Sequence, residues 1–223
     1  MNSSGSLLFQ VLLYLHIAGG MTGLITGLFN VTGKKGSRAH KKTGLIYVAG
    51  MFAATLCGIV LAFMKDNNFL FLIGIFSFYL AFTGYRSLKN KSENPTLVKW
   101  IDVWVAVITC IFSIWMVISA LIYLNPFRLH FNPVQFIFGV AGLVFSVGDL
   151  LWFFGKRKFK FGKFQWMFTH IGRMVGSYIS AVTAFLVVNI NFLPPLLIWL
   201  GPSVLGSCVI AYNIRKYRLK LRV

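Results

Sequence analysis

Long apolar segments alternate with short polar segments along the whole chain. A membrane-spanning helix needs about 20 mainly apolar residues, each contributing a rise of about 1.5 Å. Seven segments meet this requirement, at residues 7–31, 43–64, 69–85, 100–124, 134–154, 165–188 and 194–213. Polar breaks rich in Lys, Asn and Pro separate them. The pattern predicts an all-α polytopic membrane helix bundle of about seven transmembrane helices, forming a single transmembrane domain over residues 1–223.

The amino-acid composition supports this prediction. Hydrophobic residues make up 57% of the chain and charged residues 12%, whereas soluble domains contain about 45–50% and about 25%. So much apolar surface excludes a soluble or disordered chain. Three cysteines in 223 residues exclude a disulfide-stapled secreted domain. The first apolar segment follows no basic region, so we expect a retained helix rather than a removed signal peptide.

The net charge of +18 reflects the orientation of the helices and not nucleic-acid binding. Alternate connections, together with the C-terminal tail, carry five, four, five and five Lys or Arg residues, whereas the connections between them carry one, one and none. Under the positive-inside rule this places the N-terminus outside and the C-terminus in the cytoplasm. The expected location is the bacterial inner membrane, with anionic lipid headgroups bound at the cytoplasmic face.

Two parts of the sequence resemble each other. In each, a glycine-containing helix leads through a basic connection to a histidine and a second helix, with His40 in the first copy and His170 in the second. The copies are four helices apart and would share one orientation, as in transporters built from parallel repeats. The pattern predicts a parallel internal repeat of helices 1–2 and 5–6. The competing interpretation is that basic connections resemble one another by composition.

A few ionisable residues fall within or beside the apolar segments. Asp149 and Arg173 lie at similar depths on neighbouring helices, and an unpaired charge within the bilayer costs about 2.5–3.5 kcal/mol or more. We therefore expect these two side chains to meet, either as a structural salt bridge or as part of a polar site.

Three further residues lie in the same inner third of the bilayer. His40 and Tyr47 are seven residues apart and share a helix face, as do His170 and Arg173 at i and i+3. The pattern predicts a binding site on the cytoplasmic side built from His40, Tyr47, Asp149, His170 and Arg173. The alternative is that the histidines cap helix entries among lipid headgroups.

The first helix carries His16, Gly20, Gly23, Gly27 and Asn30 at alternating spacings of four and three, which form one continuous face. Small residues let membrane helices approach closely, so packing explains this stripe. Alternatively, the glycines leave room for a flat cofactor beside His16.

These motifs carry a family resemblance. The chain resembles an uncharacterised bacterial family of polytopic membrane proteins in three motifs. They are the glycine stripe led by His16 in the first helix, the His-x-x-x-Gly-x-x-Tyr motif from His40 to Tyr47, and the His-x-x-Arg-Met-x-Gly-Ser-Tyr motif that includes His170 and Arg173. The resemblance covers most of the chain. It implies a multi-helix membrane fold and no established activity.

Three classes of function fit these features. Small-solute or proton-linked transport would use the predicted polar site. A b-type haem would need two ligands at one depth. His16 and His170 lie roughly 15 Å apart in depth by helical rise, whereas His40 and His170 fit. The third class is a non-catalytic scaffold or lipid-binding component. The sequence favours binding over enzymatic catalysis and is compatible with a small-molecule ligand or a homo-oligomer.

Overall fold

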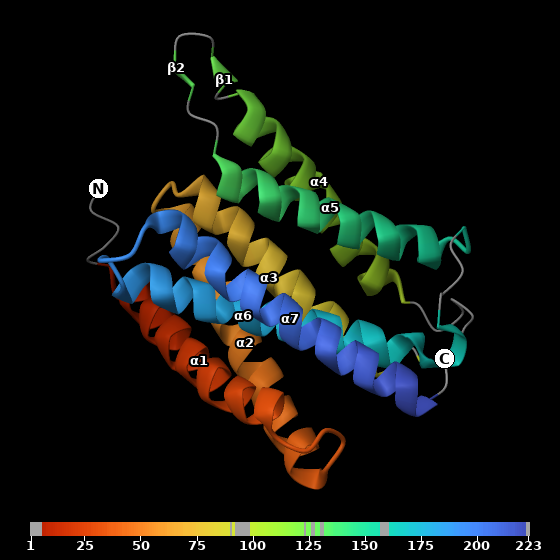
Figure 1. The fold of residues 1–223 in the computed structure, drawn as a ribbon. Coiled ribbons are helices and arrows are strands. Elements are labelled where there is room, and N and C mark those ends of the chain that lie inside the picture. Colours follow the sequence, from red (N-terminus) through yellow and green to blue (C-terminus); the bar gives the residue numbers. More distant parts are fainter. Residues whose placement is uncertain are drawn as a thin grey trace.

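A computed structural model shows seven long helices arranged as a bundle (Figure 1). The structure describes residues 6–89, 91, 99–122, 124–125, 128–129, 132–156 and 161–221. Each helix is long and apolar enough to cross a membrane, so the predicted all-α fold with seven spanning helices is confirmed. In chain order the helices are α1 (Leu7–Thr32), α2 (Arg38–Met64), α3 (Asn68–Arg86), α4 (Trp100–Ile122), α5 (Pro133–Phe153), α6 (Gln165–Asn189) and α7 (Pro195–Leu221).

Three short elements lie between the long helices in the described part of the chain. The strands β1 (Leu124–Asn125) and β2 (Arg128–Leu129) pair antiparallel between α4 and α5. A single 3-10 turn, η3 (Gly162–Phe164), precedes α6.

Side-chain caps determine where four of the helices begin. The side-chain oxygens of Ser6, Ser37, Asn67 and Asn132 each accept a hydrogen bond from the backbone N–H three residues further on. Such a cap satisfies a donor that the first helical turn leaves free. Because Ser37 caps α2, this helix begins at Arg38, five residues before the predicted start, and His40 lies in its first turn.

Two predicted boundaries were wrong for one physical reason. Hydropathy reports the part of a helix that lies in lipid, whereas backbone hydrogen bonding continues through charged residues. Thus α2 includes Arg38, Lys41 and Lys42, and α7 continues eight residues beyond the predicted end at residue 213, to Leu221.

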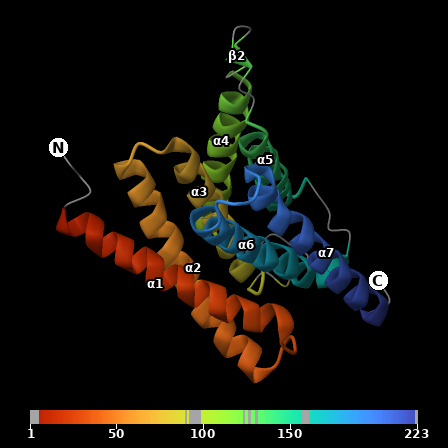
Figure 2. The same ribbon diagram turned by 60° about the vertical axis from the view of Figure 1, so that its left-hand side comes forward.

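The helices form antiparallel pairs around α3. Helix α1 packs along α2, α4 along α5 and α6 along α7, while α3 contacts α2, α4, α5 and α6. Figure 2 shows these pairs on different sides of α3. Because α6 packs along α7 rather than along α5, α5 and α6 do not form a pair like that of α1 and α2. The parallel repeat stays a prediction.

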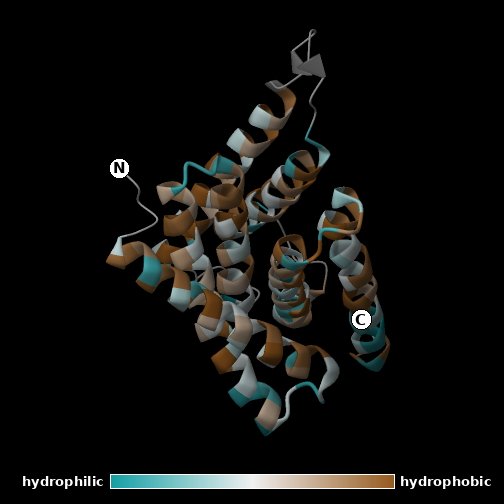
Figure 3. Cartoon of the chain, turned by 90° about the vertical axis from the view of Figure 1, so that its left-hand side faces the viewer, coloured by the Kyte–Doolittle hydropathy of each residue, from teal (hydrophilic) through white to brown (hydrophobic). Residues whose placement is uncertain are grey.

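One end of the bundle collects the basic segments. The α1–α2 turn, the start of α4, the end of α5, the start of α6 and the end of α7 all lie there, because successive helices alternate in direction. Hydrophilic residues are visible at the α1–α2 turn and near the end of α7 (Figure 3). We call this the basic end. Arg157, Lys158, Lys160 and Arg222, which contribute to the predicted charge asymmetry, lie outside the described residues.

Backbone contact between α1 and α2 depends on glycine. A Cβ atom at Gly19 would lie 2.7 Å from the carbonyl oxygen of Gly50, and one at Gly50 would lie 2.9 Å from that of Gly19. Gly23 and Gly27 are buried along the same face of α1. The prediction that Gly20 belongs to this stripe was wrong, because a Cβ atom there meets nothing within 4 Å. Several helix faces are compatible with the glycine spacing, and only the rotation of α1 selects one.

The two adjacent glycines provide a matched test of this contact. Gly19→Ala is expected to lower the free energy of unfolding by about 1–3 kcal/mol, because the new methyl group meets rigid backbone. Gly20→Ala is expected to leave stability unchanged or slightly raised, because alanine is the better helix former. Thermal unfolding in detergent measures both. Equal effects of the two substitutions would contradict the observed α1–α2 contact.

Candidate functional site

A cavity of about 530 Å³ lies between the helices at the basic end. The end of α1, the start of α2, the end of α3, the start of α6 and the end of α7 line it. Apolar and aromatic side chains provide most of its walls. The polar and basic side chains among them include Asn30, Lys35, His40, Lys91, His170 and Asn213. We call it the basic-end cavity, and a cavity of this size falls in the range of small-molecule sites.

Two histidines from different helices line this cavity. His40 lies in the first turn of α2, where its backbone N–H donates to Ser37 Oγ at 3.1 Å. His170 lies on α6, and its Nδ1 is 2.9 Å from the carbonyl oxygen of Gly84 on α3. The imidazoles are close enough to interact electrostatically. The structure therefore brings together two residues that are 130 positions apart in the sequence.

Tyr47, the third predicted residue at this cavity, closes it on the inner side. Its side chain is buried, and its hydroxyl is 2.6 Å from Ser177 Oγ on α6. The rings of Tyr47 and Tyr178 pass beside Gly27, where a Cβ atom would lie 2.3 Å from the Tyr178 ring. The absence of a side chain at Gly27 on α1 thus leaves space for the rings of Tyr47 and Tyr178, which line the inner side of the cavity.

Lys35 brings positive charge to the cavity without a carboxylate to balance it. Its Nζ donates to the backbone carbonyl oxygens of Asn30, at 2.8 Å, and of Gly33 and Val31 at the end of α1. Burial and then the nearby ammonium of Lys216 lower the pKa of Lys35 below its ordinary value. Within the described part of the chain, the cavity lining contains no Asp or Glu.

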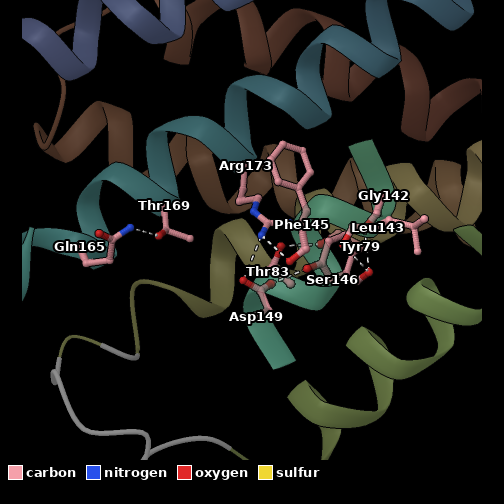
Figure 4. A network of polar contacts seen from close by, with 10 residues as sticks. All are labelled: Tyr79, Thr83, Gly142, Leu143, Phe145, Ser146, Asp149, Gln165, Thr169 and Arg173. Atoms are coloured by element: carbon pink, nitrogen blue, oxygen red, sulfur yellow. Dashed lines mark hydrogen bonds and ion pairs between the residues drawn. The ribbon is translucent and has the colours of Figure 1, made fainter. Parts of the chain in front are cut away.

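The buried Arg173 and the half-buried Asp149 form a separate cluster on the other side of α6. Arg173 Nη2 donates to Asp149 Oδ1 at 3.0 Å, and the hydroxyl of Tyr79 on α3 donates to Asp149 Oδ2. The guanidinium also stacks 4.3 Å from the centroid of the Phe145 ring. Figure 4 shows these side chains converging from α3, α5 and α6. The predicted contact between Asp149 and Arg173 is confirmed.

The five predicted site residues therefore separate into two groups. His40, Tyr47 and His170 line the basic-end cavity, whereas Asp149 and Arg173 pair among α3, α5 and α6. His170 and Arg173 both meet α3 near Gly84, but the imidazole bonds its carbonyl while the guanidinium extends to α5. The i, i+3 spacing of His170 and Arg173 on α6 alone could not show which neighbouring helix each side chain contacts.

His16 lies far from both groups. Its Nδ1 is 2.7 Å from the carbonyl oxygen of Ala54, and its ring meets Gly58 on α2. Gly58 is about 27 Å along α2 from His40 by helical rise. His16 therefore joins α1 to α2, away from the basic-end cavity.

A second ion pair at the basic end, between Arg86 and Asp102, was not predicted from the sequence. Arg86 holds Asp102 through two hydrogen bonds of 2.6 Å, and the carboxylate also accepts from the backbone N–H of Lys99 at 3.0 Å. Asp102 is only 3% exposed. The signal was an acidic residue in the first turn of α4, where a carboxylate satisfies free backbone donors. A small cavity of about 50 Å³ separates this pair from Asp149.

No family model, curated protein or solved structure matches this chain.

A double-mutant cycle tests the buried Asp149–Arg173 pair. Asp149→Asn or Arg173→Met alone is expected to lower the free energy of unfolding by about 3–5 kcal/mol, because each leaves a buried partner uncompensated. The double variant is expected to lose less than the sum. Unfolding in detergent measures all three variants.

The control cycle combines Asp149→Asn with Gly19→Ala. These sites share no partner, so their effects are expected to add within about 0.5 kcal/mol. Strictly additive losses for Asp149 and Arg173 would show that the salt bridge contributes no coupling.

Proposed function

We propose that this chain is a multi-pass protein of the bacterial inner membrane, with its C-terminus in the cytoplasm, and that its basic-end cavity binds a small amphipathic anion. One observation carries the proposal: apolar walls and the cationic Lys35 meet in one cavity whose described lining has no acidic residue. Apolar walls favour an apolar body by about 25 cal/mol per Å² buried. An anionic group would offset the positive charge of Lys35 through space, since its ammonium already donates to three backbone carbonyl oxygens.

The electrostatics of Lys35 support an anion over a neutral ligand. The lowered pKa of its ammonium shows that burial and Lys216 disfavour its charge. A bound anion would offset both effects and raise this pKa, so binding would be linked to proton uptake. Affinity would then be retained at low pH and lost as pH rises through the pKa of Lys35.

Proton-linked transport is the form of this function that the two cavity histidines suit. Imidazole is the side chain that titrates nearest physiological pH, so His40 and His170 could exchange protons as an anion enters or leaves, provided that neither imidazole binds a metal. Anionic lipids at the basic end could provide the same ligand chemistry as a free anion.

Binding of a fluorescent long-chain fatty acid, with its methyl ester as the neutral analogue, tests the proposal. The protein in detergent is expected to prefer the acid. Lys35→Met is expected to lower affinity for the acid about tenfold, or about 1.4 kcal/mol, and to leave ester binding unchanged. Lys42→Met is the matched control, because Lys42 belongs to the same basic segment, is exposed and does not line the cavity.

A second pair of variants tests the place of binding. A Cβ atom at Gly44 meets only Asn30 Nδ2, at 4.0 Å, so Gly44→Leu is expected to fill the cavity and abolish binding. Gly20→Leu adds the same side chain where nothing lies within 4 Å and is expected to bind normally. Competition with anionic lipid micelles then distinguishes a lipid headgroup from a free anion. Equal binding of acid and ester would refute the proposal.

The proposed orientation has its own test. A reporter fused after Val223 is expected to report the cytoplasm, and one inserted near Asn67 is expected to report the outside, because the basic connections remain on the cytoplasmic side. Alkaline phosphatase and green fluorescent protein fusions measure the two locations. An external C-terminus would contradict the proposed orientation.

A further inference from the structure

We propose that the amphipathic anion of the basic-end cavity is a b-type haem whose iron is ligated axially by His40 and His170, an inference that rests on the proposed function. Haem fits the chemistry of the cavity because it combines a flat apolar ring with two carboxylates on one edge. Imidazole is a common axial ligand of haem iron. The two histidines come from different helices, α2 and α6, and face one cavity.

The hydrogen bond of His170 prepares one ring nitrogen for a metal. Its Nδ1 lies 2.9 Å from the backbone carbonyl oxygen of Gly84, which can only accept, so the proton lies on Nδ1. The lone pair is then on Nε2, which makes no hydrogen bond with the described residues. Metal-binding histidines commonly hold their second nitrogen in this way, since the bond fixes both tautomer and ring orientation.

His40 offers a second ligand with a different restraint. Its backbone is held by the Ser37 cap, and its Nδ1 is buried without a hydrogen-bond partner among the described residues. Four residues later on the same face of α2, Gly44 leaves open space where a Cβ would touch only Asn30 Nδ2 at 4.0 Å. A flat ring beside His40 needs such space.

The number of ligating side chains favours haem over a bare metal ion. In the part of the chain that the structure describes, no group of three or more His, Cys, Asp and Glu residues could hold a metal. A protein-bound zinc ion usually takes three or four protein ligands. A haem iron receives four equatorial nitrogens from its own ring, so two histidines complete its coordination.

The basic side chains suit the haem carboxylates. Lys35 lines the cavity at the α1–α2 turn. Lys91 follows α3 in the chain, and its Nζ lies 4.8 Å from the centroid of the Trp166 ring at the start of α6. A haem whose carboxylates face the basic end would place its apolar ring against Tyr178 and Met174 deeper in the bundle. This orientation separates the charged edge from the interior of the bilayer, as the cost of buried charge requires.

The test is the visible and electron paramagnetic resonance spectrum of full-length protein produced with added δ-aminolaevulinate and purified in mild detergent. We expect about one haem per chain with the six-coordinate, low-spin spectrum of two imidazole ligands. His40→Gly and His170→Gly are each expected to lose the low-spin signal, and free imidazole should restore it, which a merely structural role would not allow. His16→Gly is the matched control and should keep the wild-type spectrum.

Two outcomes would overturn the haem assignment. One is protein that neither contains haem nor binds added hemin with a saturable low-spin spectrum. The other is a haem spectrum that is unchanged in His40→Gly and His170→Gly. If haem-free protein still prefers the fatty acid to its ester, the haem assignment fails while the proposed anion binding survives. Protein that neither binds haem nor prefers the fatty acid to its ester rejects both the haem assignment and the proposed anion binding.

Discussion

The polar side of α3 is the constraint on which the arrangement of this bundle depends. A bilayer offers no water to satisfy buried polar groups, so they must find partners within the protein. Over its last two turns α3 supplies three such partners: the hydroxyl of Tyr79 for Asp149 on α5, the carbonyl oxygen of Gly84 for His170 on α6, and the guanidinium of Arg86 for Asp102 on α4. One helix therefore fixes the basic ends of three neighbours.

The basic-end cavity follows from this arrangement. Hydrogen bonds and an ion pair draw α6 towards α3 and α5, whereas α1 is held to α2 by glycine contacts and by His16. Between these two groups the helices meet through bulky side chains, with the Tyr47–Ser177 hydrogen bond as the polar link on the inner side. The basic-end cavity lies between this hydrogen bond and the basic end of the bundle. His40 lines it from α2, and His170 lines it from α6.

The sequence was sufficient for features that depend on depth in the bilayer. Seven hydropathy segments correspond to the seven helices, and the cost of buried charge was enough to pair Asp149 with Arg173. It was insufficient for features that depend on helix rotation. Gly19 and Gly20 are equivalent in spacing arguments, yet only Gly19 meets α2. The division of the five site residues also depends on rotation, because His170 and Arg173 share a helix but reach different neighbours.

The charge of the basic-end cavity shows why a ligand would matter to the protein itself. Positive side chains in a partly apolar space repel each other more strongly than in water, because the effective dielectric constant is lower. Burial, and then the nearby ammonium of Lys216, lower the pKa of Lys35. In the cluster of Asp149 and Arg173 a carboxylate from the chain offsets the charge, whereas no described residue does so in the cavity. An anion that enters the cavity would thus do there what Asp149 does for Arg173, and its affinity and the stability of the basic end would rise together.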